Sequence, residues 1–269
     1  MKGRGKPFSL YLIPIWCYNL FVRMPKAIPK LNLLLDGCQV LGIPIDERQE
    51  KQFARYCLTL ADWNQRVNLT SIVEPEAVQT IHFLDSLTVA GALPEETLQG
   101  GRVMDIGAGA GFPGVPLKIA FPGIHLELLE ATGKKVTFLN HLVDYLELSN
   151  VEVRLGRAED LAKDPALRET FDAVLARGVA KMATLVELTL PFLRTGGLLV
   201  AHKKGDITEE LHDATKAVRV IGGKTPIIKQ VEVPGLTDDR VLIIVEKVSP
   251  TPSAFPRRAG MPTKQPISK

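Results

Sequence analysis

The sequence predicts an α/β protein with a mostly parallel, doubly wound sheet and an antiparallel hairpin at one edge. Apolar segments short enough to be strands alternate with helical segments from residue 102 to about residue 219. This alternation is typical of parallel sheets. Two further β segments, 226–233 and 240–246, follow with no helix between them. Consecutive strands joined by a turn pair in antiparallel fashion, which predicts the edge hairpin.

The composition fits an ordinary globular chain of 269 residues, with 45% hydrophobic and 23% charged residues. This length suits one α/β domain with a smaller addition. We expect an N-terminal extension outside the core at residues 1–30 and a helical cap at 31–98. The sheet domain should span 99–248, and a basic, proline-rich, extended tail should follow at 249–269.

Helical periodicity and capping signals define the expected cap. Apolar residues between Leu31 and Leu41 fall on one helical face. A second helix begins at Asp46, whose capping-box partner is Gln49. A third helix begins at Pro75, because proline suits the first turn of a helix.

The third predicted helix carries His82, Asp85 and Ser86 on one face, a set of residue types found in hydrolase triads. Triad members normally come from separate segments, and the sequence contains no G-x-S-x-G elbow. We therefore expect this face to pack on the sheet domain, with His82 and Asp85 hydrogen-bonded.

Further strands are predicted in the sheet domain at 125–130, 151–155, 171–176 and 198–202. A helix at 182–193 should end because of the glycine pair Gly196-Gly197. Another helix should begin at Asp206, with Glu209 as its capping-box partner.

A glycine-rich turn follows the first predicted strand. The segment 102–114 reads RVMDIGAGAGFPG, with glycines at 107, 109, 111 and 114. Its apolar part, which contains Asp105, predicts a buried strand, and Pro113 and Pro116 suit a helix start. A strand, a glycine turn and a helix open a nucleotide-binding βα unit, because glycines let the backbone approach a ligand closely.

Two ligand classes fit this turn. Glycines 109, 111 and 114 match the G-x-G-x-x-G pattern of dinucleotide sites, which place a pyrophosphate at a helix N-terminus. Glycines 107, 109 and 111 behind Asp105 match the D-x-G-x-G-x-G pattern of S-adenosylmethionine (SAM) sites. The sequence favours SAM, since an acid attracts its ammonium and sulfonium and repels pyrophosphate. The antiparallel edge hairpin also favours the seven-stranded methyltransferase sheet. A turn that serves only the fold is the third interpretation.

The charge and cysteine patterns limit partners and compartment. Residues 1–30 and 247–269 carry basic side chains and no acidic one, so the ends could bind a polyanion or simply be solvated. Three cysteines without pairing or metal-ligand spacing predict a reduced, cytoplasmic protein with no metal site. The apolar run 8–22, interrupted by Pro14, is shorter than a span of about 20 residues, so no membrane association is expected. No stable protein partner is evident.

Four polar residues stand at the ends of predicted strands: Asp105, Glu130, Glu159 and Arg177. Ligands of doubly wound sheets bind outside these carboxyl ends. Glu130 follows the glycine turn by about twenty residues, as expected of an acid that binds a ribose diol of SAM or NAD. Glu159, beside Ala158, could accept from an adenine amino group or favour a helix start. Arg177 could bind cofactor or substrate, or pair with a neighbouring acid.

Absent residues restrict the methyl acceptor of a SAM enzyme. No cysteine follows residue 57, which excludes thiolate attack on a pyrimidine by this domain. No N-P-P-Y or D-P-P-Y tetrapeptide follows the fourth strand, where amino-group methyltransferases carry it. Guanine N7 fits, because its in-plane lone pair needs no proton removed. Such catalysis rests on proximity and orientation, so no catalytic side chain is assigned.

Six motifs together resemble a known family: Asn68-Leu-Thr-Ser-Ile72, His82-Phe-Leu-Asp-Ser-Leu87, the segment Asp105 to Ile119, Arg157-Ala-Glu159, Ala176-Arg-Gly-Val-Ala180 and Pro256-Arg-Arg-Ala-Gly-Met-Pro262. The sequence is similar over residues 31–266 to the RsmG (GidB) family of bacterial 16S rRNA guanine-N7 methyltransferases. The resemblance implies a Rossmann-like seven-stranded SAM methyltransferase sheet with a helical cap. It also implies SAM as cofactor and 16S rRNA or the small ribosomal subunit as substrate. Ala108 and Gly178 depart from the family pattern.

The resemblance also implies a cofactor site, to which the glycine turn adds Gly109. The expected contacts are Gly107, Gly109, Phe112, Glu130, Ala131, Thr132, Ala158, Glu159 and Arg177. Candidate RNA contacts are Lys203, Lys204, Arg257 and Arg258, because basic side chains bind phosphates without specifying a base. Phe112 would stack on a base or pack in the core. The alternatives to the methyltransferase are an NAD(P)-dependent oxidoreductase and a non-catalytic rRNA-binding assembly factor on the same fold.

Overall fold

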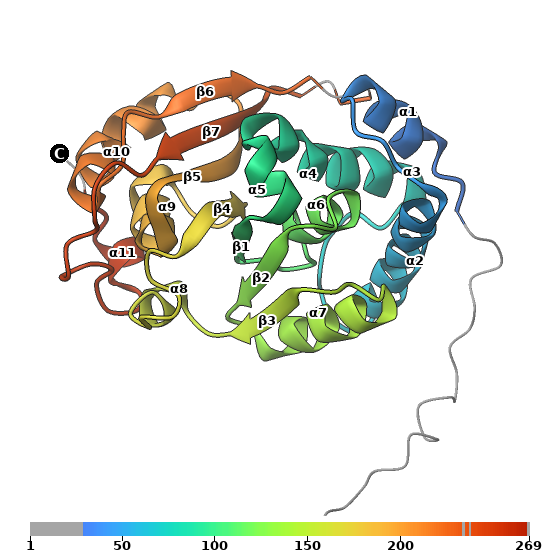
Figure 1. Cartoon of the computed structure of the whole chain (residues 1–269), viewed down its shortest axis with the longest axis horizontal. Helices are drawn as coiled ribbons and strands as arrows, with labels where there is room; N and C mark the ends of the chain where they lie inside the picture. The colour runs from blue at the N-terminus through green and yellow to red at the C-terminus, as the bar shows by residue number, and fades with distance from the viewer. Residues whose placement is uncertain (1–28, 233–234, 237, 268–269) are drawn as a thin grey trace, which may run out of the picture.

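The computed structural model describes residues 29–232, 235–236 and 238–267, and Figure 1 shows a central sheet between layers of helices. Seven strands form one sheet in the order β3-β2-β1-β4-β5-β7-β6. The strands from β3 to β5 pair in parallel, whereas β7 is antiparallel to both of its neighbours. The predicted seven-stranded sheet with an antiparallel edge hairpin is confirmed. The extension predicted at residues 1–30 lies outside the described residues, except for its last two.

The strands are β1 Arg102–Ile106, β2 His125–Glu130, β3 Val151–Leu155, β4 Phe171–Arg177, β5 Leu193–Lys204, β6 Ile227–Gln230 and β7 Arg240–Glu246. The α-helices are α1 Asn32–Val40, α2 Glu47–Asn64, α3 Pro75–Ala77, α4 Asp85–Leu87, α5 Glu95–Gly100, α6 Gly114–Ala120, α7 Gly133–Tyr145, α8 Ala158–Leu161, α9 Met182–Thr189, α10 Thr208–Ile221 and α11 Met261–Lys264. A π-helical stretch, Val78–Leu84, joins α3 to α4 into one continuous helix. Among the described residues, no helix is both long and apolar enough to cross a membrane.

The sheet separates two hydrophobic cores. On β4, Ala173 and Leu175 pack into the core formed with α1, α2, α6 and α7, while Val174 and Ala176 pack into the core formed with α8, α9 and α10. Successive side chains of a strand point to opposite faces, so a strand covered on both faces carries a nearly continuous apolar run. The helices of residues 31–92 thus share a core with the sheet.

The capping box predicted for α2 is confirmed and also fixes this helix on the sheet domain. Asp46 Oδ1 accepts from the Gln49 backbone N–H at 2.8 Å, and Gln49 Oε1 accepts from the Asp46 backbone N–H at 2.7 Å. The Gln49 amide then donates to the carbonyls of Ile119 and Ala120 at the end of α6. These carbonyls have no partner within their own helix, so one side chain serves two helix ends.

The predicted end of the helix at 182–193 is wrong. The α-helix ends at Thr189, a 3-10 turn follows, and Gly196 and Gly197 lie inside β5. Gly196 has φ +85°, and a Cβ on Gly197 would approach the Phe171 carbonyl oxygen to 2.9 Å. The glycines therefore allow close backbone approach at an irregular point of the β4–β5 pairing.

The start predicted for the last long helix is also wrong. α10 begins at Thr208, and Asp206 Oδ1 accepts from the Thr208 backbone N–H at 2.9 Å in an Asx turn. Glu209 is consequently not a capping-box partner. The neighbouring acid Glu210 instead bonds to the Met182 backbone N–H at the start of α9, at 2.7 Å.

The C-terminal segment is packed on the domain, where we predicted an extended tail. Arg168 donates to the carbonyls of Thr251 and Phe255, both at 2.9 Å. The Thr251 backbone N–H donates to Glu169 at 2.6 Å, and Thr251 Oγ1 donates to the Ile221 carbonyl at 2.9 Å. The segment includes the short helix α11, which lies beside α9 (Figure 1).

Candidate cofactor site

A cleft of about 200 Å³ opens at the carboxyl ends of β1, β2 and β3. Its walls include five residues predicted from sequence: Gly107, Glu130, Ala131, Ala158 and Glu159. The remaining lining is largely apolar and includes Ile106, Leu129, Val179, Ala180 and Leu188, with Thr263 contributed by the C-terminal segment. Ligands of doubly wound sheets bind at this edge.

The Glu130 carboxylate organises the two turns that border the cleft. One oxygen, Oε2, accepts from the Gly109 backbone N–H at 3.0 Å, and the other, Oε1, accepts from the Thr132 backbone N–H at 2.8 Å. Gly107 and Gly109 both have positive φ, at +71° and +58°, which glycine adopts without strain. One side chain at the end of β2 therefore fixes the turn after β1 and the turn that follows β2 itself.

Asp105 lies behind the glycine turn and does not line the cleft. Its side chain is fully buried, and Oδ2 accepts from the Gly114 backbone N–H at 2.8 Å, at the start of α6. Burial raises the pKa of Asp105 to about 7. The direct attraction that we expected between this acid and a cationic cofactor is therefore not supported. The acid instead fixes the turn to the first helix of the βα unit.

Glu159 lies on the cleft wall, but its carboxylate already has a partner from the chain. Its Oε1 accepts from the Gly260 backbone N–H at 2.8 Å and from Arg157 at 3.3 Å. Burial raises the pKa of Glu159, but these hydrogen bonds outweigh burial and hold the pKa below its usual value. The residue predicted to bind an adenine amino group also holds the C-terminal segment.

Phe112 and Arg177 lie together beside the glycine turn and are absent from the lining of the cleft. Phe112 is 5% exposed and stacks between His82 and Tyr56, with ring centroids 4.5 and 5.3 Å away. The Arg177 guanidinium lies 4.8 Å from the Phe112 ring centroid and donates to Asp85 at 2.9 Å. Of the two roles left open for Phe112, the structure shows packing. Arg177 pairs with Asp85, which is one of the roles that the sequence left open for this arginine.

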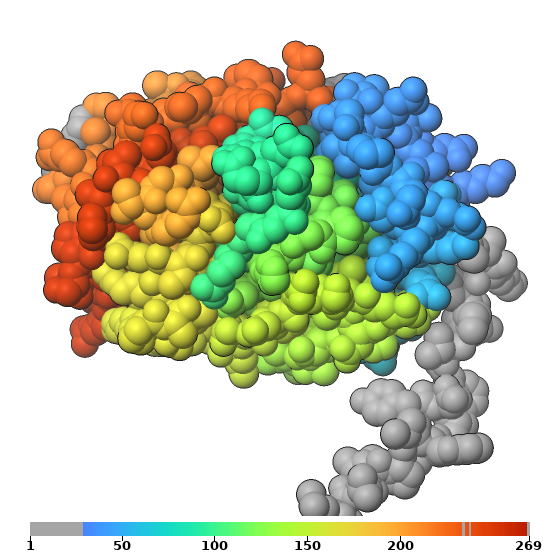
Figure 2. All heavy atoms as spheres, viewed as in Figure 1, coloured from blue at the N-terminus to red at the C-terminus, as the bar shows by residue number. Residues whose placement is uncertain are grey.

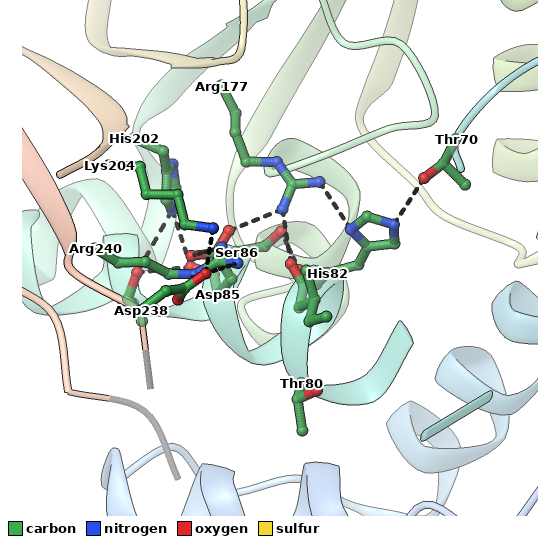
Figure 3. Close-up of polar contacts among 12 residues, drawn as sticks. Thr70, Thr80, His82, Asp85, Ser86, Arg177, His202, Lys204, Asp238 and Arg240 are labelled. Atoms are coloured by element: carbon green, nitrogen blue, oxygen red, sulfur yellow. Dashed lines mark hydrogen bonds and ion pairs between the residues drawn. The ribbon is translucent and has the colours of Figure 1, made fainter. Parts of the chain in front are cut away.

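A buried network joins the third N-terminal helix to the sheet, as Figure 3 shows. The Asp85 carboxylate, in a residue only 1% exposed, contacts Arg177 at the end of β4 and Arg240 at the start of β7, each at 2.9 Å. His202 of β5 hydrogen-bonds to the Asp85 carbonyl at 2.9 Å. The prediction that this face packs on the sheet domain, with His82 and Asp85 hydrogen-bonded, is confirmed. Arg240 and His202 were missed, because nothing near them in the sequence indicates a contact with Asp85.

The four candidate RNA contacts differ in their surroundings. Lys203 pairs with Glu210 at 2.5 Å, and Lys204 pairs with Asp238. Arg257 pairs with the fully buried Glu187 through both carboxylate oxygens. Arg258 is exposed and has no side-chain partner among the described residues, so it remains available to a phosphate.

The His82 imidazole is held neutral by its surroundings. Its Nδ1 lies 3.3 Å from the Arg177 guanidinium, which can only donate, and its Nε2 lies 3.0 Å from Thr70 Oγ1. This arrangement assigns the proton to Nε2. Burial and the charge of Arg177 lower the pKa of His82 from 6.5 to about 4.

We predict that His82 remains neutral down to about pH 4 in the folded protein. Its folded-state pKa lies below its unfolded value, so the unfolded chain binds more protons between pH 6.5 and 4. His82 therefore makes the fold less stable as the pH falls through this window. Asp105, whose pKa is raised, has the opposite effect on stability, so the stability of the whole protein does not isolate the contribution of His82. An NMR titration of the His82 signal measures its pKa directly. A His82→Gln variant assigns the signal, and titration near pH 6.5 would contradict the prediction.

Comparisons with known proteins show what this chain is similar to. A SAM-dependent methyltransferase from Aquifex aeolicus aligns with a TM-score of 0.47 and 19% identity, over 65% of this chain and 94% of that one. Ribosomal RNA small subunit methyltransferase G from Dehalococcoides mccartyi is 49% identical, over 88% of this chain and 100% of the relative. The protein of that name from Roseiflexus castenholzii is 47% identical, over 84% and 95%. Residues 49–239 match the family model GidB, rRNA small subunit methyltransferase G. The chain therefore belongs to the GidB family.

Proposed function

We propose that this protein transfers the methyl group of SAM to N7 of a guanine in 16S rRNA of the small ribosomal subunit. Membership of the GidB family and the name shared by its relatives support the substrate class. The observation that carries the proposal is the cleft at the carboxyl edge of the sheet, where the Glu130 carboxylate and the glycine turn meet. A cytoplasmic location would follow from this substrate.

The lining of the cleft fits SAM. A carboxylate such as Glu130 accepts hydrogen bonds from a ribose diol, and the apolar side chains of Leu129, Ala158 and Leu188 suit an adenine ring. Gly107, which lines the cleft, presents backbone without a side chain to the methionine part. Ala131 and Thr132 flank Glu130 at the turn after β2.

The reaction requires orientation and no general base. SAM supplies an electrophilic methyl group on a sulfonium, and guanine N7 offers a lone pair without a proton to remove. Holding the two groups in line accounts for most of the rate in such a reaction. His82 is consistent with this mechanism, because both of its ring nitrogens are already hydrogen-bonded and its pKa of about 4 makes it a poor base near neutral pH.

The proposal predicts that the protein transfers labelled methyl groups from SAM to undermethylated small-subunit RNA. Purified protein would be incubated with assembled subunits and, separately, with naked 16S rRNA, and the modified base would be mapped by mass spectrometry. Label on guanine N7 supports the proposal. Absence of label in both substrates, despite RNA binding, would favour the non-catalytic assembly factor.

We predict that Glu130→Ala weakens binding of S-adenosylhomocysteine, the demethylated product, by tenfold or more, equivalent to about 1.4 kcal/mol. The variant loses the ribose acceptor and the hydrogen bonds to the Gly109 and Thr132 backbones. Glu127→Ala is the matched control, because it removes another largely buried carboxylate of β2 that pairs with Arg102 and Arg154 away from the cleft.

Isothermal titration calorimetry measures both affinities. Equal affinity for wild type and Glu130→Ala would show that the ribose does not bind at Glu130. A similar loss of affinity in Glu127→Ala would attribute the effect to general destabilisation of the fold. A thermal-shift assay with NADH addresses the oxidoreductase alternative. Stabilisation by NADH and none by S-adenosylhomocysteine would contradict the proposal that SAM is the cofactor.

We predict that Arg258→Ala weakens RNA binding and reduces the salt slope of the affinity by about 1, since one phosphate contact is lost. Arg258 is suited to this contact because it is exposed, whereas Arg257 is paired with Glu187. Arg219→Ala, at the end of α10, is the control for loss of an exposed arginine elsewhere. Filter-binding titrations at several salt concentrations measure the slopes, and identical slopes for wild type and Arg258→Ala would exclude this contact.

A further inference from the structure

The C-terminal segment 256–264 forms part of the wall of the cofactor cleft. It follows one edge of the molecule, where Figure 2 shows its red surface beside the yellow and orange surface of the chain around α8 and α9. Thr263 of this segment lines the cleft together with Ala158, Glu159 and Leu188. Residues far apart in the sequence, at the end of β2, on α8 and in α11, thus enclose one space.

Two buried carboxylates hold this segment in place. Glu187 of α9 is fully buried and accepts from the Arg257 backbone N–H at 2.9 Å, from Arg257 Nε at 2.9 Å and from Arg257 Nη2 at 2.6 Å. Glu159 of α8, which is 2% exposed, accepts from the Gly260 backbone N–H at 2.8 Å. Thr184 Oγ1 adds a hydrogen bond to the Pro262 carbonyl at 3.0 Å.

Among the described residues, Arg257 alone donates hydrogen bonds to the Glu187 side chain, so undocking of the segment would leave a buried carboxylate unpaired. Such a charge is costly in the interior of a protein. The Arg257–Glu187 pair therefore keeps the segment docked, which fixes the positions of Thr263 and of the Glu159 carboxylate at the cleft.

We propose that segment 256–264 is a latch for the cofactor, with Arg257 and Glu187 as its positioning residues. The inference rests on the proposed SAM function of the cleft. A ligand in the cleft contacts a wall that exists only when the segment is docked, so the ligand binds the docked form more tightly. By linkage, docking of the latch raises cofactor affinity, and cofactor binding stabilises the docked latch.

The test measures both directions of this coupling in the full-length protein. In the first direction, Arg257→Ala should raise the Kd for S-adenosylhomocysteine by roughly tenfold in calorimetry. Glu187→Gln, which keeps the shape of the side chain and removes its charge, should give a smaller increase. Arg194→Ala is the matched control, because it breaks an ion pair with Asp172, at 2.7 Å. This pair lies at the amino ends of β4 and β5, whereas the cleft lies at the carboxyl ends of the sheet. The Kd of Arg194→Ala should equal that of wild type.

In the second direction, saturating S-adenosylhomocysteine should slow hydrogen–deuterium exchange of wild-type peptides that cover 256–264. A peptide from α1, which packs in the core on the opposite face of the sheet from α9, serves as the internal reference and should change little. This measurement needs no variant, so it remains decisive if Arg257→Ala does not fold.

The outcomes separate the latch from the proposed function. Wild type that does not bind S-adenosylhomocysteine contradicts the cofactor and hence the proposed function. Wild type that binds it, with exchange of 256–264 unchanged, overturns the latch alone. The latch is also overturned if Arg257→Ala binds as tightly as wild type, or if Arg194→Ala loses as much affinity as Arg257→Ala.

Discussion

The Asp85 carboxylate holds the third N-terminal helix against the carboxyl edge of the sheet. It contacts one guanidinium from the end of β4 and another from the start of β7, and the residue is almost completely buried. A buried carboxylate that loses its partners destabilises the fold by several kcal/mol, about 3–5 in measured cases. The helix can therefore dock in one position. That position sets the stack of His82 on Phe112, which itself belongs to the glycine-rich segment 102–114.

Buried acids perform the same task at three other points around the cleft. Asp105 joins the glycine turn to α6, Glu130 joins the turns after β1 and β2, and Glu187 holds the C-terminal segment. Asp105 accepts from the backbone N–H of Gly114, the first residue of α6, whereas Glu130 and Glu187 accept from backbone N–H groups of residues outside helices and strands. Loops cannot be positioned by a hydrogen-bond ladder, so single side chains fix them. The resulting cleft combines hydrogen-bonded carboxylates, such as that of Glu130, with a largely apolar lining.

Local features of the sequence predicted most of the sheet and part of the site. The glycine turn, the strand ends Glu130 and Arg177 and the capping box of Asp46 depend on neighbours within a few residues, and periodicity reveals the buried strands. The glycine turn and the edge hairpin favoured SAM, and the family resemblance supplied the substrate class. The division into a cap at 31–98 and a sheet domain at 99–248 stays a prediction.

Long-range contacts account for what the sequence did not predict. Asp85 and Arg240 are separated by most of the chain, and nothing adjacent to either indicates the pair. Gly196-Gly197 has the composition of a helix stop but serves a close approach between strands. Arg257 belongs to a basic tail in the sequence, but its charge is used internally by Glu187. The number of basic residues in a segment therefore does not show which of them remain unpaired in the fold and available to a substrate.

The proposed methyl transfer depends most on a sulfonium cofactor lying across the ends of β1, β2 and β3. Its most direct test is a crystal of the full-length protein soaked with S-adenosylhomocysteine and NAD together. We expect S-adenosylhomocysteine in the cleft, with its ribose hydroxyls on Glu130 and its adenine beside Ala158 and Leu188. Density for NAD at that place, or an empty cleft with ligand bound elsewhere, would contradict the account.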